Sequence, residues 1–224
     1  MPLNRYHIGA DETAGAWKES PACADIIAKH DMDDPEQLTA YFVEKVTKIV
    51  NAMGVTAGAW SDGLSHVEQE KLAPRIQANI WDALFWQGHN RAQDFANRGW
   101  DVVLSIPDAL YFDFPYALDP LEPGYYWASR NTDSFKVFRF MPDNLPAHAE
   151  FWPNRMGTPF TAKDETPLKA GSAYIGMQGQ LWSETVRDDK RAEYMIYPRL
   201  HALAERAWHK ADWEVPYQAG REYG

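Results

Sequence analysis

The stretch that decides the fold reads DPEQLTAYFVEKVTKIVNAMGVTAGAW, residues 34–60. Asp34 is a good helix cap, Pro35 suits the first helical position, and Gly54 is a typical helix end. Between them, apolar residues at spacings of four and three predict an amphipathic helix with one apolar face: Leu38, Phe42, Val46, Ile49 and Met53. A β-strand is predicted directly afterwards over Val55–Trp60, where alanine and glycine allow close packing.

The same alternation of strand and helix extends in both directions from this stretch. Further strands are predicted over residues 6–9, 75–81, 102–105 and 173–178, and further helices over residues 85–98 and 190–208. Asp188 or Asp189 caps the last helix, and Pro198 should kink or restart it. Such alternation is typical of parallel βα units.

Five strands with intervening helices fit either an open doubly wound sheet or part of a closed barrel. No glycine-rich phosphate loop follows a strand, and polar or aromatic residues gather at the carboxyl ends of the strands, where barrel enzymes build their active sites. A whole barrel needs about 250 residues and eight strands. We therefore predict an α/β fold in which residues 1–224 form one domain, the C-terminal portion (about five βα units) of a (β/α)8 TIM barrel, with a long loop insertion at about 106–170.

The composition restricts the class of partner. The chain has 224 residues, of which 45% are hydrophobic, and 22 Lys and Arg stand against 32 Asp and Glu, giving a net charge of -10. This charge disfavours binding to nucleic acid or to an acidic membrane surface. The 10 Trp, 11 Tyr and 10 Phe residues fit either a large core or aromatic faces that stack on sugar rings, and composition does not separate the two.

Cysteine usage and apolar runs narrow the possibilities further. Cys23 is the only cysteine, which excludes an intrachain disulfide and a cysteine-based zinc site. No apolar run approaches the roughly 20 residues of a membrane-spanning helix, and no signal-peptide pattern precedes the first strand. Because that strand begins almost at the first residue, we expect the natural protein to begin further upstream.

Two adjacent acids follow the first strand, in His7-Ile8-Gly9-Ala10-Asp11-Glu12. In a partly desolvated pocket their charges compete, so one carboxyl group can stay protonated near neutral pH, which suits glycoside hydrolysis. The simpler alternative is a solvated acidic loop. A metal site through His7 and Asp11 is disfavoured because no second histidine lies close in sequence. We expect no metal and no cofactor.

This segment resembles the His-x-Gly-(Gly/Ala)-Asp-Glu motif of family-20 glycoside hydrolases, the β-N-acetylhexosaminidases and chitobiases. Three further segments resemble the last strand and last helix of that family in order and separation: residues 176–184, GMQGQLWSE, residues 193–200, EYMIYPRL, and residues 202–208, ALAERAW. The resemblance covers essentially the whole chain.

The resemblance implies retaining exo-hydrolysis of terminal N-acetyl-β-hexosamine residues from chitooligosaccharides or glycoconjugates. In this substrate-assisted mechanism the acetamido oxygen of the sugar attacks its own anomeric carbon. Glu12 is then the general acid and later the base that activates water. Asp11 accepts a hydrogen bond from the acetamido N–H, and His7 supports this network.

The resemblance also implies a set of substrate-binding residues. Tyr111 hydrogen-bonds the acetamido carbonyl, and Asp113 binds the sugar or supports the residues that do. A lone tryptophan more often belongs to a core, but three at strand ends favour a pocket. The walls of the acetamido pocket are then Trp60, Trp81 and Trp182. Glu184 binds the outer hydroxyls of the sugar, and Trp127 forms a platform for the next sugar.

Other polar residues are expected to lie outside the chemistry. Asp62 and Asp82 follow strand-end tryptophans and are loop caps or hydroxyl binders, with a cap favoured for Asp82. The remaining histidines are expected to be solvated: His30, His66, His89, His148, His201 and His209.

The resemblance further implies that the N-terminal half of the barrel is missing from this sequence. Open sheet edges and uncovered apolar surface invite association. We therefore expect the chain to require that missing half, or to form a homodimer through its exposed edges, and to hydrolyse poorly alone. A non-catalytic carbohydrate-binding or scaffolding fragment, and a retaining glycosidase with a protein nucleophile, stay open as alternatives. The resemblance leaves the location of the full-length protein open among periplasm, medium and cell surface.

Overall fold

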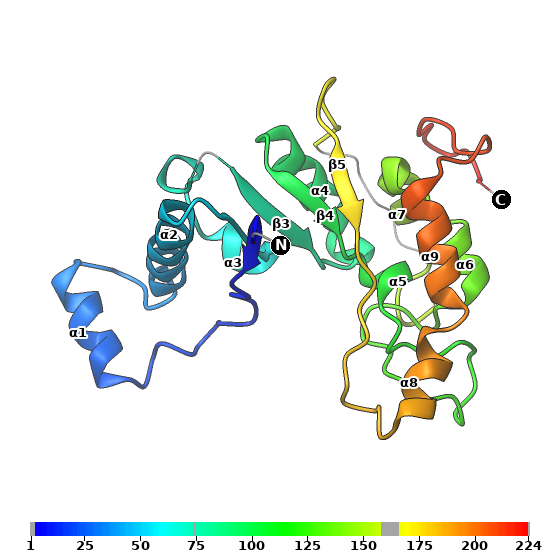
Figure 1. The fold of residues 1–224 in the computed structure, drawn as a ribbon, viewed down its shortest axis with the longest axis horizontal. Coiled ribbons are helices and arrows are strands. Elements are labelled where there is room, and N and C mark those ends of the chain that lie inside the picture. Colours follow the sequence, from blue (N-terminus) through cyan, green and yellow to red (C-terminus); the bar gives the residue numbers. More distant parts are fainter. Residues whose placement is uncertain (1–2, 74, 158–165, 224) are drawn as a thin grey trace. The chain divides into compact units, whose positions relative to one another are not determined.

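The computed structural model describes residues 3–73, 75–157 and 166–223 (Figure 1). It contains two compact units, which we describe separately. The first unit is residues 1–79 with 98–102, and the second is residues 80–97 with 103–224. No helix within the described ranges is long and apolar enough to cross a membrane.

Parallel strands order the first unit. Its elements are β1 (Arg5–His7), α1 (Pro21–Lys29), α2 (Gln37–Ala52), β2 (Thr56–Trp60), α3 (Ser61–Ser65) and a 3-10 turn (Gln69–Lys71). It also contains β3 (Ile76–Ile80) except for its last residue, and the first two residues of β4 (Asp101–Leu104). Strand β1 pairs in parallel with β2, with His7 opposite Gly58, and β2 pairs in parallel with β3, with Trp60 opposite Asn79. Alanine and isoleucine side chains of β2 and β3 form the core of this sheet: Ala57, Ala59, Ile76 and Ala78.

The second unit begins at the end of β3 and includes β5 (Tyr174–Met177). The strand order places β4 beside β3 and β5 beside β4. The N–H of Ser105 donates to the carbonyl of Ile80, and the N–H of Gln178 donates to that of Leu104, both at 2.8 Å. The helices of the second unit are α4 (Gly88–Asn97), α5 (Pro107–Leu110), α6 (Ser134–Phe138), α7 (Leu145–Phe151), α8 (Asp189–Ile196) and α9 (Arg199–Trp208). Two 3-10 turns lie at Leu84–Trp86 and Pro142–Asn144.

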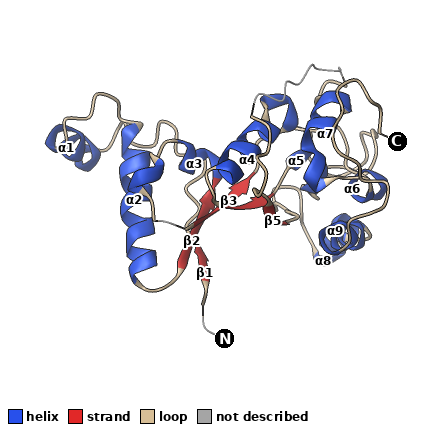
Figure 2. Cartoon of the chain, turned by 90° about the horizontal axis from the view of Figure 1, so that it is seen from above, coloured by secondary structure: helices blue, strands red, loops and turns tan. Residues whose placement is uncertain are grey.

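All five predicted strands are confirmed, each within a residue or two of its predicted bounds, and helices separate them along the chain (Figure 2). The long segment over 106–170 holds α5, α6 and α7, and its residues 158–165 lie outside the described residues. The restart at Pro198 is also confirmed, because α8 ends at Ile196 and α9 begins at Arg199. The Asp188 side chain caps α8 by accepting the N–H of Arg191 at 2.7 Å.

Helix α2 differs from the prediction in its start and its buried face. Asp34 makes a turn before the helix, where its side chain accepts the N–H of Glu36, and the helix begins only at Gln37. Two threonines belong to the buried face, which consists of Leu38, Thr39, Val43, Thr47 and Val50. Part of the predicted apolar stripe faces outward instead, with exposed fractions of 46%, 62% and 73% for Phe42, Ile49 and Met53.

The threonine hydroxyls explain why this face could be buried. Thr47 Oγ1 donates to the carbonyl of Val43 at 2.7 Å, and Thr39 Oγ1 accepts from Trp17 Nε1 at 2.9 Å. A hydroxyl satisfied in this way loses most of the cost of leaving water. The predicted helix over 85–98 also begins late, because Gln87 adopts a left-handed conformation between the 3-10 turn and α4.

Candidate functional site

The first unit holds the adjacent acids on a loop directly after β1. The N–H of Ile8 donates to Gly58 at 2.8 Å, and the N–H of Trp60 donates to the carbonyl of Gly9 at 3.0 Å, so β2 fixes both sides of the turn. Ala10 has φ of 71°, a left-handed value that is costly for a residue with a side chain. Gly63 of α3 lies so close to the Ala10 carbonyl that any Cβ there would overlap it. The loop therefore has a tightly defined path.

Asp62 anchors the end of this loop. Its Oδ2 accepts the N–H of Glu12 at 2.7 Å, and Glu12 is itself left-handed, with φ of 52°. Asp62 was predicted as a cap or a hydroxyl binder, and the structure shows it holding the backbone of the predicted general acid. The expected desolvation is only partial in this unit, because Asp11 is half-buried while Glu12 is exposed.

His7, the last residue of β1, lies beside the acid loop. Its ring meets the Trp60 indole edge-on, with centroids 5.2 Å apart. Its Nδ1 accepts the N–H of Gly9 at 3.2 Å, and its side chain also hydrogen-bonds Asn79. Partial burial lowers the pKa of His7 below its ordinary value, while the charge of Asp11 and the bond to Asn79 oppose that shift. The imidazole is therefore held as a fixed hydrogen-bonding group rather than as a cation.

The second unit gathers most of the predicted aromatic residues around Trp127. The Trp127 ring meets the Trp81, Tyr111 and Phe114 rings edge-on, with centroid distances of 5.7, 5.6 and 5.7 Å. Trp86 stacks on it at 5.6 Å and keeps 53% of its own surface exposed. Sequence reasoning missed Trp86, although it lies on the same strand-end connection as Trp81. Trp127, predicted as a sugar platform, is the centre of a cluster whose exposed indole is Trp86.

Backbone pairing brings Tyr111 to Trp182. Tyr111 forms a parallel bridge with Gln180, in which the N–H of Phe112 donates to the Gln180 carbonyl at 2.6 Å. The Tyr111 and Trp182 rings then meet edge-on at 6.2 Å. A Cβ on Gly179 would press against Phe112 at 3.0 Å, so glycine is needed for this close approach. Two segments about seventy residues apart in sequence thus place these rings together.

Asp113, two residues after Tyr111, is a buried carboxyl group. Burial raises its pKa to about 6, Glu184 adds to this rise, and hydrogen bonds from the backbone N–H groups of Asp113 and Trp182 oppose it. Its Oδ1 is buried and has no hydrogen-bond partner among the described residues. Asp113 thus fixes the backbone of Trp182, while Glu184 is exposed nearby.

Arg199 fixes the segment that carries Tyr111 and Asp113. Its guanidinium is fully buried and donates to the carbonyls of Phe112, Phe114 and Thr132, the last two at 2.8 and 2.9 Å. Its carbon centre also lies 4.0 Å from the centre of the Tyr116 ring. The sequence did not predict this role for Arg199, because a lone arginine at the start of a helix is ordinarily a surface residue.

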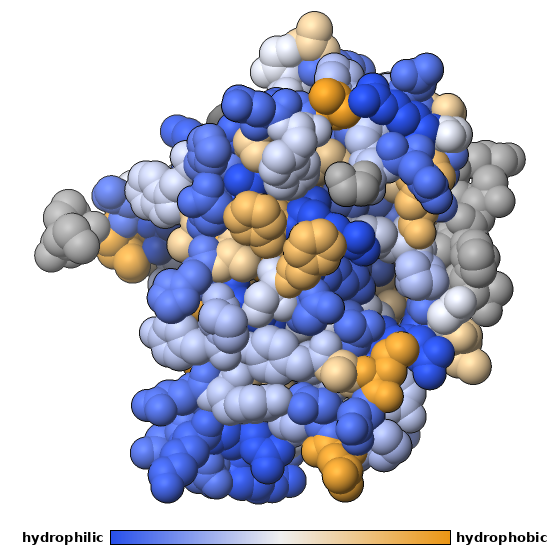
Figure 3. Space-filling view, turned by 90° about the vertical axis from the view of Figure 1, so that its right-hand side faces the viewer, coloured by the Kyte–Doolittle hydropathy of each residue, from blue (hydrophilic) through white to orange (hydrophobic). Residues whose placement is uncertain are grey.

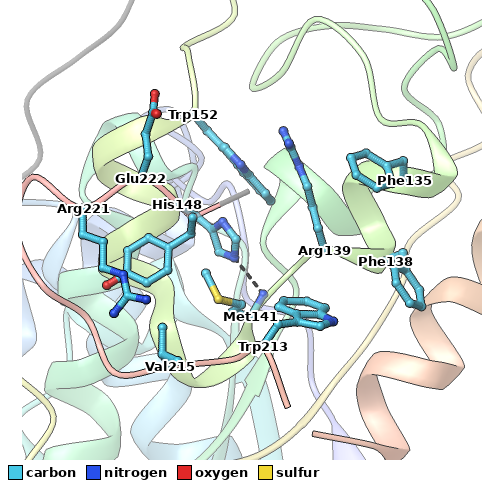
Figure 4. Close-up of a pocket in the computed structure, with 11 residues that line it drawn as sticks. Phe135, Phe138, Arg139, Met141, His148, Trp152, Trp213, Val215, Arg221 and Glu222 are labelled. Carbon is cyan, nitrogen blue, oxygen red and sulfur yellow. Dashed lines mark hydrogen bonds between the residues drawn. The ribbon is translucent and has the colours of Figure 1, made fainter. Parts of the chain in front are cut away.

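Two of the six histidines expected to be solvated are buried instead, which corrects that expectation. His89 belongs to α4, and His148 belongs to α7 beside a cavity of about 470 Å³ whose walls include Trp152 and Trp213 (Figure 4). His148 Nε2 accepts the N–H of Met141 at 2.7 Å, and burial lowers its pKa to about 3. A neutral imidazole that satisfies a backbone donor is a structural part of a core.

Asp82, for which a loop cap was the favoured prediction, instead pairs with an arginine of α4. Asp82 accepts a charged hydrogen bond from Arg91 Nε at 2.9 Å, so it tethers α4 to the end of β3. Within the described ranges, no group of three or more His, Cys, Asp or Glu side chains lies suitably for a metal ion.

The face of the protein in Figure 3 is largely hydrophilic, with small separate groups of hydrophobic side chains.

The structure thus assigns the predicted site residues to two groups. His7, Asp11, Glu12 and Trp60 share the first unit. The second unit contains the remainder: Trp81, Tyr111, Asp113, Trp127, Trp182 and Glu184. The first unit thus carries the adjacent acids, and the second carries the ring cluster with a buried carboxyl group.

Comparisons with known proteins identify the family. Residues 1–211 match the glycosyl hydrolase family 20 catalytic domain. The chain is 51% identical over its whole length to β-hexosaminidase B of Pseudoalteromonas piscicida, covering 29% of that protein. It is 40% identical to N,N'-diacetylchitobiase of Vibrio harveyi over 99% of the chain and 28% of that protein.

A solved structure supports the same assignment. The family-20 exo-β-N-acetylglucosaminidase of Vibrio harveyi in complex with N-acetylglucosamine matches all of this chain and 30% of its own, with a TM-score of 0.68 and 25% identity. Together with the parallel sheet and its helices, this confirms the predicted fold class, part of an α/β barrel. The chain spans somewhat under a third of the length of these relatives. It belongs to glycosyl hydrolase family 20 and forms part of the catalytic domain of that family.

Proposed function

We propose that the protein to which this chain belongs removes terminal non-reducing N-acetyl-β-hexosamine residues from chitooligosaccharides or glycoconjugates, with retention of the anomeric configuration. The observation that carries this proposal is the acid loop, in which Asp62 and the β2 backbone hold Asp11 and Glu12 at the end of β1. The family membership and the names of the relatives, β-hexosaminidase and diacetylchitobiase, support it.

In the first chemical step, Glu12 donates its proton to the glycosidic oxygen while the acetamido oxygen of the same sugar forms a bond to the anomeric carbon. The bond from that carbon to the leaving oxygen breaks, and a cyclic oxazolinium-type intermediate forms. Asp11 accepts the hydrogen bond of the acetamido N–H and stabilises the positive charge that develops there. Glu12, now a carboxylate, then takes a proton from the water that opens the ring.

The second unit supplies groups for the sugar itself. We assign the Tyr111 hydroxyl to the acetamido carbonyl, the indoles of Trp81 and Trp182 to the walls of the acetamido pocket, and Glu184 to the outer hydroxyls. Trp60, whose ring touches His7, serves as a wall on the acid side. Asp113 keeps the Trp182 backbone in place.

The direct test is release of a chromogenic aglycone from an N-acetyl-β-glucosaminide. Glu12→Gln and Asp11→Asn should each lower kcat by about 10²–10⁴-fold, the usual range for a lost general acid or base. Asp25→Asn, on the exposed face of α1, is the matched control and should change nothing. Because the chain alone should turn over poorly, the same variants are also compared in a hybrid in which it replaces the matching part of the Pseudoalteromonas relative.

The outcomes separate this function from its alternatives. Binding of a thiazoline mimic of the intermediate, with no turnover in the chain or the hybrid, would favour a non-catalytic carbohydrate-binding fragment. A glycosyl adduct trapped on a protein carboxylate would instead show a protein nucleophile and contradict the substrate-assisted route.

We further propose that the isolated chain associates, either with the N-terminal half of a barrel or with a second copy of itself. The support is the outward face of α2, where Phe42, Ile49 and Met53 are exposed next to a sheet in which β1 pairs with β2. Exposed apolar side chains and open strand edges favour association. Light scattering over a range of concentrations should show a mass above that of a monomer, and serine at these three positions should lower it. A monomer at every concentration contradicts the proposal.

A further inference from the structure

A glycine in β2 lets side chains of β1 and β3 meet within the first unit. Strand β2 lies between the other two, and Gly58 pairs with His7 on one side and with Gln77 on the other. A Cβ on Gly58 would lie 3.3 Å from His7 Cδ2 and 3.4 Å from Gln77 Cβ, closer than most such contacts. Glycine at this position thus leaves room for polar side chains of β1 and β3 to interact across β2.

Polar contacts run along this face of the sheet. Arg5 Nη2 lies 2.8 Å from Asp101 Oδ2, and Arg5 Nη1 donates to Gln77 Oε1 at 3.3 Å. Gln77 Nε2 donates in turn to Asn79 Oδ1 at 2.8 Å, and the Asn79 side chain hydrogen-bonds His7. We call these five residues the polar ladder. The interior of a barrel is ordinarily filled by bulky branched side chains, so packing alone does not require polar residues here.

The two hydrogen bonds of His7 fix which ring nitrogen carries the proton. Nδ1 accepts the N–H of Gly9 at 3.2 Å, so it carries no hydrogen of its own. The bond to Asn79 raises the pKa of His7, against the lowering by burial, which means that the imidazole donates and the amide oxygen accepts. The hydrogen of the neutral imidazole therefore lies on Nε2.

The amide of Asn79 is itself held in one orientation. The residue is 1% exposed, and its Oδ1 accepts from Gln77 Nε2 as well as from the His7 ring. A carbonyl oxygen has two lone pairs and can accept both bonds. Turning the amide over would set its NH₂ group against two donors, and a buried polar group left in that way is unfavourable. Gln77 thus keeps the oxygen of Asn79 directed at His7.

We propose that Asn79 is a positioning residue for the acid loop. Its oxygen, oriented by Gln77, keeps His7 in the tautomer whose Nδ1 accepts the N–H of Gly9, and that bond holds the turn that presents the adjacent acids. The inference rests on the proposed function, because the acids that the ladder serves are those assigned to the reaction. All the residues involved belong to the first unit.

The charges around His7 determine how it responds to a change at Asn79. Among the described residues, Asp11 on the acid loop is the charged group that acts on His7. Arg5, two residues earlier on β1, is paired with Asp101, and the positions of β2 and β3 that lie beside His7 are uncharged residues. Asn79→Asp would place a second carboxylate at the donor nitrogen, so it should favour the imidazolium and raise the pKa of His7.

Protonation of His7 breaks the bond to the acid loop. An imidazolium carries hydrogen on both nitrogens, so Nδ1 can no longer accept the N–H of Gly9. In Asn79→Asp this bond is therefore present above the raised pKa and is lost as the pH falls through it. Asn79→Ala should act in the opposite direction on the pKa of His7, because it removes the acceptor that favoured the charged form.

The first test is an NMR titration of the full chain between about pH 5 and about pH 9, which spans the ordinary range of histidine. In the parent chain the His7 ring and the Gly9 amide should titrate with one common midpoint. Asn79→Ala should move both midpoints down, and Asn79→Asp should move both up. Asn4→Ala, at an exposed position before β1, is the matched control and should leave them unchanged.

The second test is turnover of the chromogenic glycoside by the hybrid protein. Asn79→Ala should lower kcat about tenfold with little change in KM, because the acids lose their orientation. Asn79→Asp should turn over almost like the parent near about pH 8.5 and lose about tenfold in kcat near about pH 6, where His7 is charged. A purely structural role for Asn79 would give losses that do not depend on pH.

The outcomes of the two tests are separable. A His7 midpoint that is the same in all variants, or that both substitutions move in one direction, overturns the inference, and so does a Gly9 amide that does not follow His7. Asn79→Asp nearly preserves the shape of the side chain, so its shift decides the matter if Asn79→Ala does not fold. A parent hybrid without turnover contradicts the proposed function, while the titration still decides whether Asn79 controls His7 and Gly9.

Discussion

The two units hold their candidate site residues in different ways. In the first unit, the acid loop depends on a few backbone hydrogen bonds, one carboxylate acceptor and one glycine contact, and Glu12 stays exposed. In the second, the rings around Trp127 pack against a buried core, and the fully buried Arg199 braces the segment beneath them. The difference indicates that substitutions near the acids should act mainly on activity, whereas substitutions behind the rings should act mainly on stability.

The largest effect is expected at Arg199. Arg199→Met should lower the free energy of unfolding by about 3–5 kcal/mol, because it leaves several buried carbonyl acceptors without their charged donor. Denaturant unfolding followed by tryptophan fluorescence measures this loss. Arg191→Met, on the exposed side of α8, is the control and should change stability by less than about 0.5 kcal/mol. A similar small change for Arg199→Met would show that the brace is not what stabilises the second unit.

A smaller, pH-dependent effect is expected at Asp108 of α5. Burial raises its pKa to about 6 although Lys136 and the N–H of Leu84 favour the charged form, and burial likewise lowers the pKa of Lys136 to about 8. The folded state thus binds the Asp108 proton more tightly than the unfolded chain, so its contribution to stability is present below about pH 4 and is lost as the pH rises to about 6.

Asp108→Asn should therefore flatten the dependence of the unfolding free energy on pH. A pKa shift of about two units corresponds to a change of at most about 3 kcal/mol in that free energy. The measurement is the unfolding free energy of both proteins at about pH 3.5 and about pH 7, which lie on either side of this window. Asp25→Asn, exposed on α1, should keep the dependence of the parent chain. If Asp108→Asn keeps it as well, the buried carboxyl does not titrate as described.

The smallest stability change and the clearest change in activity are expected at Asp62. Asp62→Ala removes the acceptor of the Glu12 N–H, a charged hydrogen bond that contributes about 1.5–3 kcal/mol at most and less at an exposed site. Activity on the chromogenic glycoside should fall roughly tenfold, in kcat rather than in KM, because Glu12 loses its orientation. Asp62→Asn retains an acceptor oxygen and should recover most of the rate; equal losses in both variants would assign Asp62 another role.

Much of the fold was predictable because it depends on local patterns. The five strands follow from short β runs between turn signals, and the restart at Pro198 follows from proline geometry. Helix α1 was missed although Ser20 followed by Pro21 is a helix-start pattern, because none of its residues is buried and so no apolar period marks it. The buried face of α2 was misread because Thr39 and Thr47 count as polar in a pattern while their hydroxyls are satisfied in the fold.

The candidate site was predictable to the extent that the resemblance to a family named its residues. The structure adds that the His7 ring meets the Trp60 ring and the Tyr111 ring meets the Trp182 ring, while the roles of these residues toward a sugar stay predictions. Contacts set by tertiary packing were not accessible: the stacking of Trp86 on Trp127 joins residues about forty positions apart, and the Arg199 brace joins α9 to a loop that carries no regular pattern.

The division into two units has a practical consequence for building chimaeras. The chain passes between the units at residues 79–80, 97–98 and 102–103, so the boundary runs through β3 and β4 rather than through a linker. A crossover placed at 79–80 or at 102–103 would therefore join parental sequences within β3 or within β4. Exchanges confined to residues 106–157 cross no boundary, which makes that stretch the natural one for recombining substrate preference while the parental acids are kept.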